Sequence, residues 1–286
     1  MGTAADRGQR LHARAGQAGL RLGRAVRSAR ADDPLRGGRP PPADRRLRAR
    51  GRALDGGRPA VVFFHGGAWR LGDRAQFHPQ CERLAAVGYV AATAAYSLDG
   101  SIAACARDAQ AAVEQLLSSA DDLGIDPGRV AVAGGSAGGH LAACLAACPV
   151  FRPSVAPAAA VLFNPVLDFV ATMRALGDFA PETGVPAEQL SPVHQDLSAL
   201  PPTIVFHGTA DSLVAIDQSR RFRDEAEAAG ARCELVEFEG REHAFFNPVP
   251  PELAAVPGLV NVDDFDATVA AMLGFLAGVL GPVEHA

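Results

Sequence analysis

Lysine is absent from this 286-residue sequence, so its 27 Lys-plus-Arg positions are all arginine. A phosphate-binding P-loop ends in Gly-Lys-Ser or Gly-Lys-Thr, and that ending is therefore missing. The glycine-rich stretch at residues 134–139 does not match the G-x-G-x-x-G spacing of dinucleotide-binding proteins either. These absences argue against a phosphate-binding loop. We attribute the lack of lysine itself to compositional bias.

Long apolar runs are also lacking. No run reaches the roughly 18–20 residues that a membrane-spanning helix needs, and the N-terminal end has no apolar stretch typical of a secretory signal. The formal net charge is −5, and a mildly acidic chain has no overall attraction for nucleic acid or anionic lipid. We therefore expect a cytoplasmic protein without a membrane span and without a nucleic-acid partner.

Cysteine is scarce and scattered. An odd number of cysteines at irregular spacing does not predict a disulfide framework. Two of them lie four residues apart on a predicted helix, but without a nearby pair of further ligands they make a poor metal site. We expect this pair to be small buried side chains. The five are Cys81, Cys105, Cys144, Cys148 and Cys233.

Charge divides the chain into two parts. Residues 1–58 hold 15 of the 27 arginines and only 5 of the 32 acidic residues, whereas the remainder is strongly acidic. The first part is rich in Arg, Ala, Gly and Pro and has few large apolar residues at any period, so it cannot bury enough surface to offset its ordering entropy. We expect residues 1–58 to be disordered or non-native, with at most a short basic helix at Leu20–Ala31.

After residue 58, short apolar runs alternate with stretches of helical periodicity. This alternation predicts an α/β fold, in which a mostly parallel sheet is covered by helices on both faces. Functional residues of such sheets gather at the carboxyl ends of the strands. We expect strands at 60–64, 89–95, 130–133, 158–163, 203–206 and 233–238, and helices at 74–87, 102–119, 140–147, 217–229 and 263–280, with a turn at 126–128.

The motif G-x-S-x-G occurs at Gly134–Gly138, between a predicted strand and a predicted helix. A sharp strand-to-helix turn lifts the serine hydroxyl above the sheet, and glycines on both sides leave room for the strained backbone. The N-terminus of the next helix can then stabilise developing negative charge. The motif predicts Ser136 as a catalytic nucleophile.

A second motif, His65-Gly66-Gly67-Ala68-Trp69, directly follows the strand predicted at 60–64. Acyl transfer passes through a tetrahedral oxyanion that needs N–H donors already in place. Adjacent glycines let the backbone turn its N–H groups into a cavity, so Gly66 and Gly67 are candidate donors. The N–H of Ala137, after the nucleophile, is the expected third donor. We expect His65 to brace this loop.

The base should be a histidine beyond the acid, because the chain order in this arrangement is Ser, then Asp or Glu, then His. His243 follows the last predicted strand, where a loop can bring it over the serine. His140 lies on the helix of the nucleophile, His194 lies in a long connection, and His207 precedes the acid; the tail residue His285 is set aside. We therefore predict His243 as the general base.

The acid should follow the preceding strand. Asp211 lies in the loop after the strand predicted at 203–206, where a carboxylate can orient an imidazole and stabilise the imidazolium. The later Asp217 is better placed to cap a helix. Glu242 is adjacent to the base and poorly placed to hold it. These arguments predict Asp211 as the acid, with a solvated turn residue as the alternative.

Taken together, these motifs resemble the α/β-hydrolase superfamily, in particular the esterases related to hormone-sensitive lipase and bacterial acetylesterases. The resemblance implies Ser136, Asp211 and His243 as a catalytic triad, with no cofactor and no metal. From its motifs we add Trp69, Tyr96 and Phe245 as candidate substrate-binding residues. The resemblance also includes Gly72, Asp108-Ala109, Gly124-Ile125-Asp126-Pro127, Arg129, His140, Asn164-Pro165, Pro201-Pro202 and His207-Gly208-Thr209-Ala210-Asp211.

Two features depart from the resemblance. Ala244 stands after the base, where relatives usually have glycine, and this replacement is expected to tighten the loop. Relatives also begin with an antiparallel hairpin, for which residues 1–58 show no strand pattern. A shifted reading frame in a GC-rich gene would account for such a stretch, and we take residues 59–286 as the catalytic domain.

The connection between Leu167 and Pro201 is long for a simple loop and carries several apolar side chains: Phe169, Met173, Leu176 and Phe179. We expect residues 168–200 to form a lid that sets specificity, with a surface excursion holding its own small apolar cluster as the alternative. The predicted activity is hydrolysis of small esters, favouring short acyl groups such as acetyl. An amidase or peptidase of this fold, a catalytically silent binding protein, and a homodimer stay open.

Overall fold

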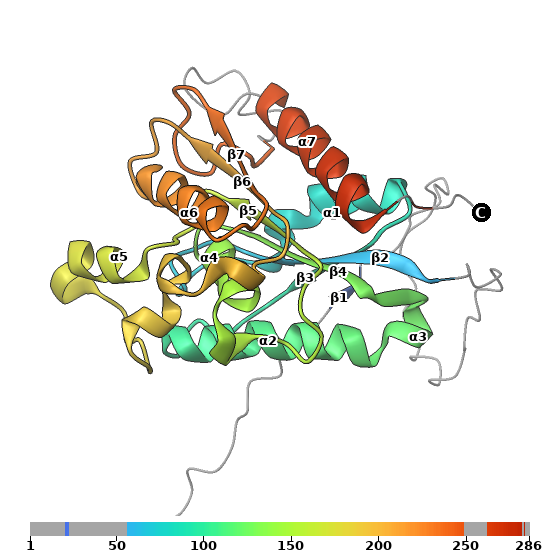
Figure 1. Ribbon diagram of the computed structural model, residues 1–286, viewed down its shortest axis with the longest axis horizontal. Helices are drawn as coiled ribbons and strands as arrows, with labels where there is room; N and C mark the ends of the chain where they lie inside the picture. The colour runs from blue at the N-terminus through green and yellow to red at the C-terminus, as the bar shows by residue number, and fades with distance from the viewer. Residues whose placement is uncertain (1–20, 23–55, 249–261, 282, 284–286) are drawn as a thin grey trace, which may run out of the picture.

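The protein is organised around a seven-stranded sheet, seen nearly edge-on in Figure 1. The computed structural model describes residues 21–22, 56–248, 262–281 and 283. The strand order is β1-β3-β2-β4-β5-β6-β7, and every neighbouring pair is parallel except β1 and β3. The strands are β1 (Arg21–Leu22), β2 (Arg58–Phe64), β3 (Val90–Ala94), β4 (Ile125–Gly135), β5 (Ala159–Phe163), β6 (Thr203–Gly208) and β7 (Cys233–Phe238).

Helices cover both faces of the sheet, as Figure 1 shows. One apolar cluster joins the sheet to α2, α4 and α6, and a second joins its other face to α1 and α7. This layering confirms the predicted α/β class. The helices are α1 (His78–Ala86), α2 (Ile102–Ser118), α3 (Ala120–Leu123), α4 (Ala137–Ala147), α5 (Phe169–Leu176), α6 (Asp217–Ala228) and α7 (Val262–Leu280).

Strand β2 shows why the sheet needs both layers. Val62 and Phe64 enter one apolar cluster, while Val61 and Phe63 enter the other, and all four side chains are fully buried. Successive side chains of a strand point to opposite faces, so an unbroken apolar run is stable only when both faces are covered. Each such side chain contributes about 1.5–3 kcal/mol of burial free energy. Because β2, β4, β5 and β6 pair in parallel, their carboxyl ends meet at one edge.

Two local expectations near the start of the folded part were wrong, and a third is confirmed. Arg21–Leu22 form a strand antiparallel to β3, so these two residues are not part of the helix expected at Leu20–Ala31. The rest of residues 1–55 lies outside the described part. Arg58 belongs to the folded domain, because its backbone N–H and its Nη2 donate to the carbonyls of Gly124 and Leu123 at 2.8 and 2.7 Å. The turn predicted at 126–128 is present as a bulge within β4: Gly128 N–H donates to Oδ1 of Asp126 at 2.9 Å, where the register shifts between Arg58 and Ala60.

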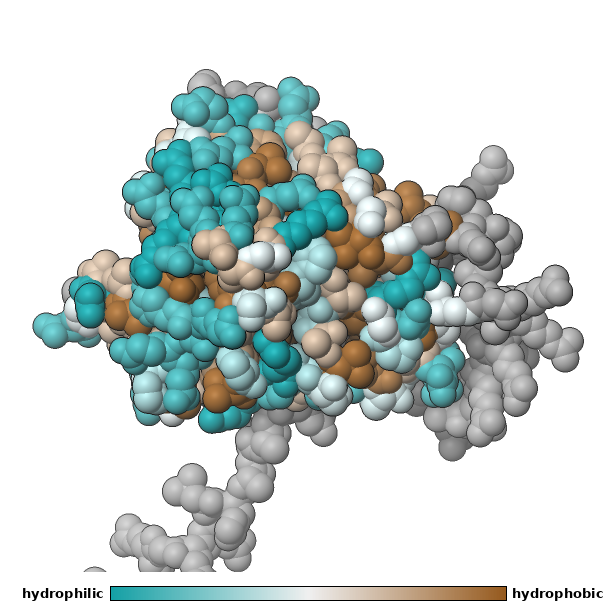
Figure 2. All heavy atoms as spheres, viewed as in Figure 1, coloured by the Kyte–Doolittle hydropathy of each residue, from teal (hydrophilic) through white to brown (hydrophobic). Residues whose placement is uncertain are grey.

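The surface over α6 is polar, and the cysteines form no disulfide. Figure 2 shows hydrophilic side chains over the strongly polar helix α6. All five cysteines are free and buried. Burial raises the pKa of Cys81 and of Cys233 to about 12, which keeps both thiols protonated at neutral pH. Among the described helices, none combines the length and the apolar character needed to cross a membrane.

Candidate active site

Ser136 stands on a strained turn between β4 and α4. Its φ of 53° and ψ of −119° lie outside the helix and strand regions that L residues prefer. Two hydrogen bonds hold this backbone: Ser136 N–H donates to the Phe163 carbonyl at 2.9 Å, and the Ser136 carbonyl accepts from His140 N–H at 2.9 Å. The first bond ties the serine to the end of β5. The turn therefore has the geometry that the G-x-S-x-G motif predicts.

The glycines of the motif are required by space. A Cβ on Gly134 would collide with the Gly138 carbonyl, and a Cβ on Gly138 would collide with the Phe64 carbonyl. These obstacles are backbone atoms, which cannot move aside as the end of a flexible side chain can. The close approach of α4 to β2 thus depends on glycine at both positions.

Asp211 and His243 come from the loops after β6 and β7 and meet as the sequence predicts. Oδ2 of Asp211 lies 2.7 Å from Nδ1 of His243. The other carboxylate oxygen, Oδ1, accepts from the N–H groups of Leu213 and Val214 at 2.9 and 2.8 Å. The Asp211 side chain is fully buried, and that of His243 is 13% exposed. A buried, fixed carboxylate on Nδ1 leaves Nε2 as the nitrogen that can accept a proton.

His207 is the second partner of the acid, a role that the sequence reasoning did not assign. Its Nε2 lies 2.9 Å from the Val214 carbonyl and 3.2 Å from Oδ2 of Asp211. Both of these oxygens can only accept, so Nε2 must carry a proton. Its Nδ1 lies 2.7 Å from the Ser219 hydroxyl. The four-residue spacing to the acid was visible in the sequence, but only the fold shows the contact.

The environment of Asp211 favours its ionised form. Burial by itself raises the pKa of the carboxyl, but hydrogen bonds from two histidines and from the Val214 N–H outweigh it. The net pKa of Asp211 is held well below the ordinary value of about 3.9.

This lowered pKa predicts a pH-dependent contribution to stability. Ionised Asp211 stabilises the fold above its unfolded pKa of about 4, and the contribution is lost as the pH falls from there toward the lowered folded value. We expect Asp211→Asn to lower the free energy of unfolding more at pH 7 than at pH 3. Urea titrations of both proteins at the two pH values measure this, and an equal difference at both would contradict the linkage.

Two further histidines, His140 and His65, are held by contacts outside the triad. His140 is fully buried, with Nε2 2.7 Å from the Leu190 carbonyl and Nδ1 accepting from Trp69 Nε1 at 3.2 Å. Burial lowers the pKa of His140 to about 4. His65 lies with Nδ1 2.9 Å from the Gly66 carbonyl, and its own carbonyl accepts from the Tyr96 hydroxyl at 2.8 Å. His65 thus braces its loop, as expected.

The oxyanion loop requires one correction. Gly66 N–H donates to Oε1 of Gln76 at 2.7 Å, so this predicted donor is already occupied. Gln76 lies in a 3-10 turn, η1 (Arg74–Phe77), before α1, and the sequence reasoning did not single it out. Within residues 56–248, no hydrogen-bond partner is found for the N–H groups of Gly67, Ala68 and Ala137. Gly67 and Ala137 remain the candidate donors, and Ala68 joins them.

The three predicted substrate-binding aromatics are packed inside the protein. Trp69 is 4% exposed and lies edge-on against His140 and Phe169, and Tyr96 is 5% exposed and stacks on His65. Phe245 is 2% exposed in the core below the base. The polar atoms of Trp69 and Tyr96 already have protein partners. This burial argues against substrate contact at these positions and gives the three residues a supporting role instead.

Backbone strain concentrates at this site. The described residues other than glycine with positive φ are Ala68, Trp69, Ser136, Asn164 and Ala244. Each lies in the oxyanion loop, at the serine turn, at the end of β5 or directly after His243. Such conformations cost of order 1–3 kcal/mol each and persist where the surroundings hold them in place. Ala244, at φ 66°, therefore takes the left-handed conformation that glycine adopts without strain.

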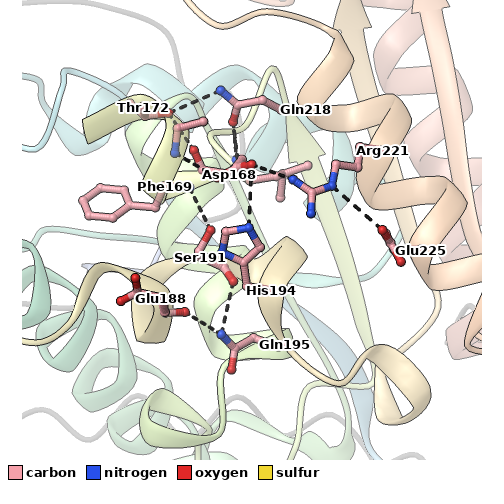
Figure 3. A network of polar contacts seen from close by, with 12 residues as sticks. Asp168, Phe169, Thr172, Glu188, Ser191, His194, Gln195, Gln218, Arg221 and Glu225 are labelled. Atoms are coloured by element: carbon pink, nitrogen blue, oxygen red, sulfur yellow. Dashed lines mark hydrogen bonds and ion pairs between the residues drawn. The ribbon is translucent and has the colours of Figure 1, made fainter. Parts of the chain in front are cut away.

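The predicted lid, residues 168–200, is anchored to α6 by the polar network in Figure 3. Asp168 caps α5 through Ala171 N–H and accepts from Arg221 Nη1 at 2.8 Å. Oε1 of Gln218 accepts from the N–H groups of Leu167 and Asp168, both at 2.9 Å. Besides α5, the segment contains the 3-10 turns Gly177–Phe179, Ala187–Leu190, Pro192–His194 and Leu197–Ala199.

Two of the four predicted apolar side chains of this segment belong to the main core. Phe169 is fully buried and stacks on His140, and Met173 packs against the same cluster. A separate apolar cluster, the alternative considered from the sequence, is therefore wrong for these two residues. Leu176 is 38% exposed, and the side chain of Phe179 lies outside the described part. Through Phe169 the segment touches Trp69 of the oxyanion loop.

Known proteins resemble this chain over about two thirds of its length. A probable carboxylic ester hydrolase of Mycobacterium tuberculosis, LipM, is 31% identical over 217 residues, 67% of this chain and 50% of the relative. An isoprenylcysteine alpha-carbonyl methylesterase of Arabidopsis thaliana is 28% identical over 217 residues, 66% of this chain and 51% of the relative. The chain thus spans about half the length of these relatives.

Solved structures extend the similarity to most of the chain. The esterase Est2 of Thermogutta terrifontis bound to propionate superimposes with a TM-score of 0.70 at 36% identity, covering 82% of this chain and 89% of that one. The same esterase phosphorylated by paraoxon gives a TM-score of 0.70 at 37% identity, covering 82% and 88%. A family model described as the alpha/beta hydrolase fold matches residues 61–180 and 172–247. The chain therefore belongs to the alpha/beta hydrolase family.

Proposed function

We propose that this protein is a carboxylesterase that hydrolyses small esters through an acyl-serine intermediate. The observation that carries the proposal is the 2.7 Å contact between buried Asp211 and Nδ1 of His243, together with a serine on a strained strand-to-helix turn at the same edge of the sheet. An acid that fixes an imidazole next to an activated serine is the arrangement that acyl transfer uses. Esterases and carboxylic ester hydrolases among the similar proteins support the same activity.

The proposed reaction has two halves. Nε2 of His243 takes the proton from the Ser136 hydroxyl as Oγ attacks the ester carbonyl carbon, and the N–H groups of Gly67 and Ala137 stabilise the oxyanion. The imidazolium then protonates the departing alcohol, which leaves an acyl-serine. Water, deprotonated by the same histidine, attacks the acyl carbon and releases the carboxylic acid. Asp211 stays ionised throughout and stabilises the imidazolium.

Short acyl groups are the proposed substrates. Est2, which shares the fold at 35–36% identity, was solved with propionate and with butyrate bound. We propose that residues 168–200 set the acyl preference, because Phe169 of this segment packs on Trp69 of the oxyanion loop at a ring distance of 5.6 Å. A cytoplasmic location and a homodimer stay predictions from the sequence.

A substrate panel tests the proposed function. We expect p-nitrophenyl acetate and butyrate to be hydrolysed with the highest kcat/KM, the octanoate ester at least about tenfold more slowly, and the matching p-nitroanilides more slowly still. Ser136→Ala measures the background. Faster cleavage of the anilides would favour an amidase, and no turnover of any compound would favour a binding protein.

A further inference from the structure

Asn164 occupies the space between the serine turn and the base. It directly follows β5, its side chain is fully buried, and its N–H donates to the Phe206 carbonyl at 2.7 Å. The preceding residue, Phe163, accepts from Ser136 N–H at 2.9 Å. The backbone of Asn164 is thereby tied to both neighbouring strand ends, and its side chain is held close to the reacting groups.

The orientation of the Asn164 carboxamide follows from its neighbours. Ala244 N–H donates to Oδ1 at 3.1 Å, and a backbone N–H can only donate, so the oxygen must face it. Nδ2 therefore faces Nε2 of His243, at 3.3 Å. Because an amide NH2 can only donate, Nε2 must accept, and the imidazole proton is placed on Nδ1. That proton lies between Nδ1 and Oδ2 of Asp211.

The same carboxamide holds the residue after the base. Ala244 lies at a φ of 66°, which costs an L residue free energy that glycine would not pay. Its N–H is bonded to Asn164, and its carbonyl accepts from the N–H and from Nδ2 of Asn247, both at 3.1 Å. Asn164 thus contacts the base at Nε2 and the strained backbone beside it.

We infer that Asn164 is a positioning residue for His243, which keeps the resting imidazole in the tautomer whose Nε2 is unprotonated and can take a proton once the bond from Asn164 opens. The inference rests on the proposed function. When the Ser136 proton reaches Nε2, that nitrogen becomes a donor facing the donor Nδ2, so their hydrogen bond is lost. Because Nδ2 of Asn164 offers no acceptor, the proton on Nε2 is not stabilised there, and the imidazolium donates it to the oxygen of the leaving alcohol.

Few charged groups face His243. Asp211 approaches Nδ1 from the loop after β6, and Glu242 precedes the histidine in its own loop, where it accepts from the Ser212 hydroxyl at 2.8 Å. His207 reaches Asp211 from the other side. On the Nε2 side the structure places the neutral Asn164. A charge introduced at residue 164 would therefore act directly on Nε2.

Two variants of nearly equal size separate positioning from packing. In Asn164→Asp a carboxylate replaces the amide, accepts a bond from a protonated Nε2 and stabilises the imidazolium. We expect kcat/KM for p-nitrophenyl butyrate at pH 7 to fall by about 10–100-fold, and the acidic limb of the pH profile to move upward by about one pH unit. The matched Asn164→Leu loses both bonds without adding charge, so kcat/KM should fall about tenfold and the acidic limb should move upward by less than in Asn164→Asp.

A measurement without turnover tests the tautomer itself. In protein labelled with 15N-histidine, and assigned with His243→Gln, the wild type should show a protonated Nδ1 and an unprotonated Nε2 at pH 7. Asn164→Asp should show a protonated Nε2, with thermal melts confirming that both variants are folded. A wild-type proton on Nε2, or an acidic limb that Asn164→Asp does not move, would overturn the inference. A wild type inactive on every ester would instead refute the proposed function, and the NMR result would still decide the tautomer.

Discussion

Replacing Ser136 by alanine is expected to lower kcat/KM for p-nitrophenyl acetate by about 10⁴–10⁶-fold. The serine Oγ is the only atom at this turn that can form the acyl intermediate, and removing it ends the covalent route. Folding should be preserved, because the turn is held by the backbone bonds to Phe163 and His140 rather than by the hydroxyl. Initial rates at substrate concentrations well below KM, with thermal melts of both proteins, measure the effect.

Covalent labelling supplies an independent check on the same residue. Est2 of Thermogutta terrifontis was solved phosphorylated by paraoxon, and a serine nucleophile here should be phosphorylated in the same way. Mass spectrometry should find one diethylphosphoryl group on the wild type and none on Ser136→Ala. Ser118→Ala, an exposed serine on α2, is the matched control and should keep both activity and labelling. Full activity or full labelling of Ser136→Ala would remove Ser136 as the nucleophile.

Asp211→Asn is expected to lower kcat by about 10⁴-fold while leaving KM nearly unchanged. An amide NH2 facing Nδ1 can only donate, so it favours the tautomer whose proton sits on Nε2, and that nitrogen can no longer take the serine proton. The loss arises in the transition state, which is why kcat falls rather than substrate binding. Initial rates over a range of p-nitrophenyl acetate concentrations separate the two constants.

The control for Asp211→Asn is Asp217→Asn, which also replaces a carboxylate by an amide but at an exposed position six residues further along the chain. Asp217 begins α6, its side chain is 84% exposed, and its contact with Arg220 at 3.3 Å is a surface ion pair. Such pairs contribute about 0–1 kcal/mol, so Asp217→Asn should keep wild-type kcat. If Asp211→Asn also kept wild-type kcat, or if both variants lost activity equally, Asp211 would not be the acid of this site.

The strands and the order of the chemical residues could be read from the sequence because both are local signals. Unbroken apolar runs such as residues 60–64 predict strands that are buried on both faces. The observed β2 is longer than this run by only two residues, Arg58 and Pro59. The G-x-S-x-G motif carries its own geometric requirement at Ser136. The placement of Asp211 and His243 after successive strands followed from the rule that strand ends meet at one edge.

Other features escaped the sequence because they depend on contacts between distant segments. Gly66 looked like a free N–H donor until the fold brought Gln76 onto it at 2.7 Å. His207 was set aside as a base, although its real contact is with Asp211. The pairing of Arg21–Leu22 with β3 joins residues about seventy positions apart, and two residues carry no strand pattern of their own.

The sequence by itself determined the α/β class and the strained serine turn, and it predicted the acid and base, since periodicity, glycine spacing and chain order are properties of neighbouring residues. Only the tertiary structure decided which polar atoms already have hydrogen-bond partners. It placed Asn164 against Nε2 of His243, His207 against Asp211 and Gln76 against Gly66. The physical reason is that hydrogen-bond partners of buried groups are chosen by packing across the sheet, where residues far apart in the chain come within 3.3 Å.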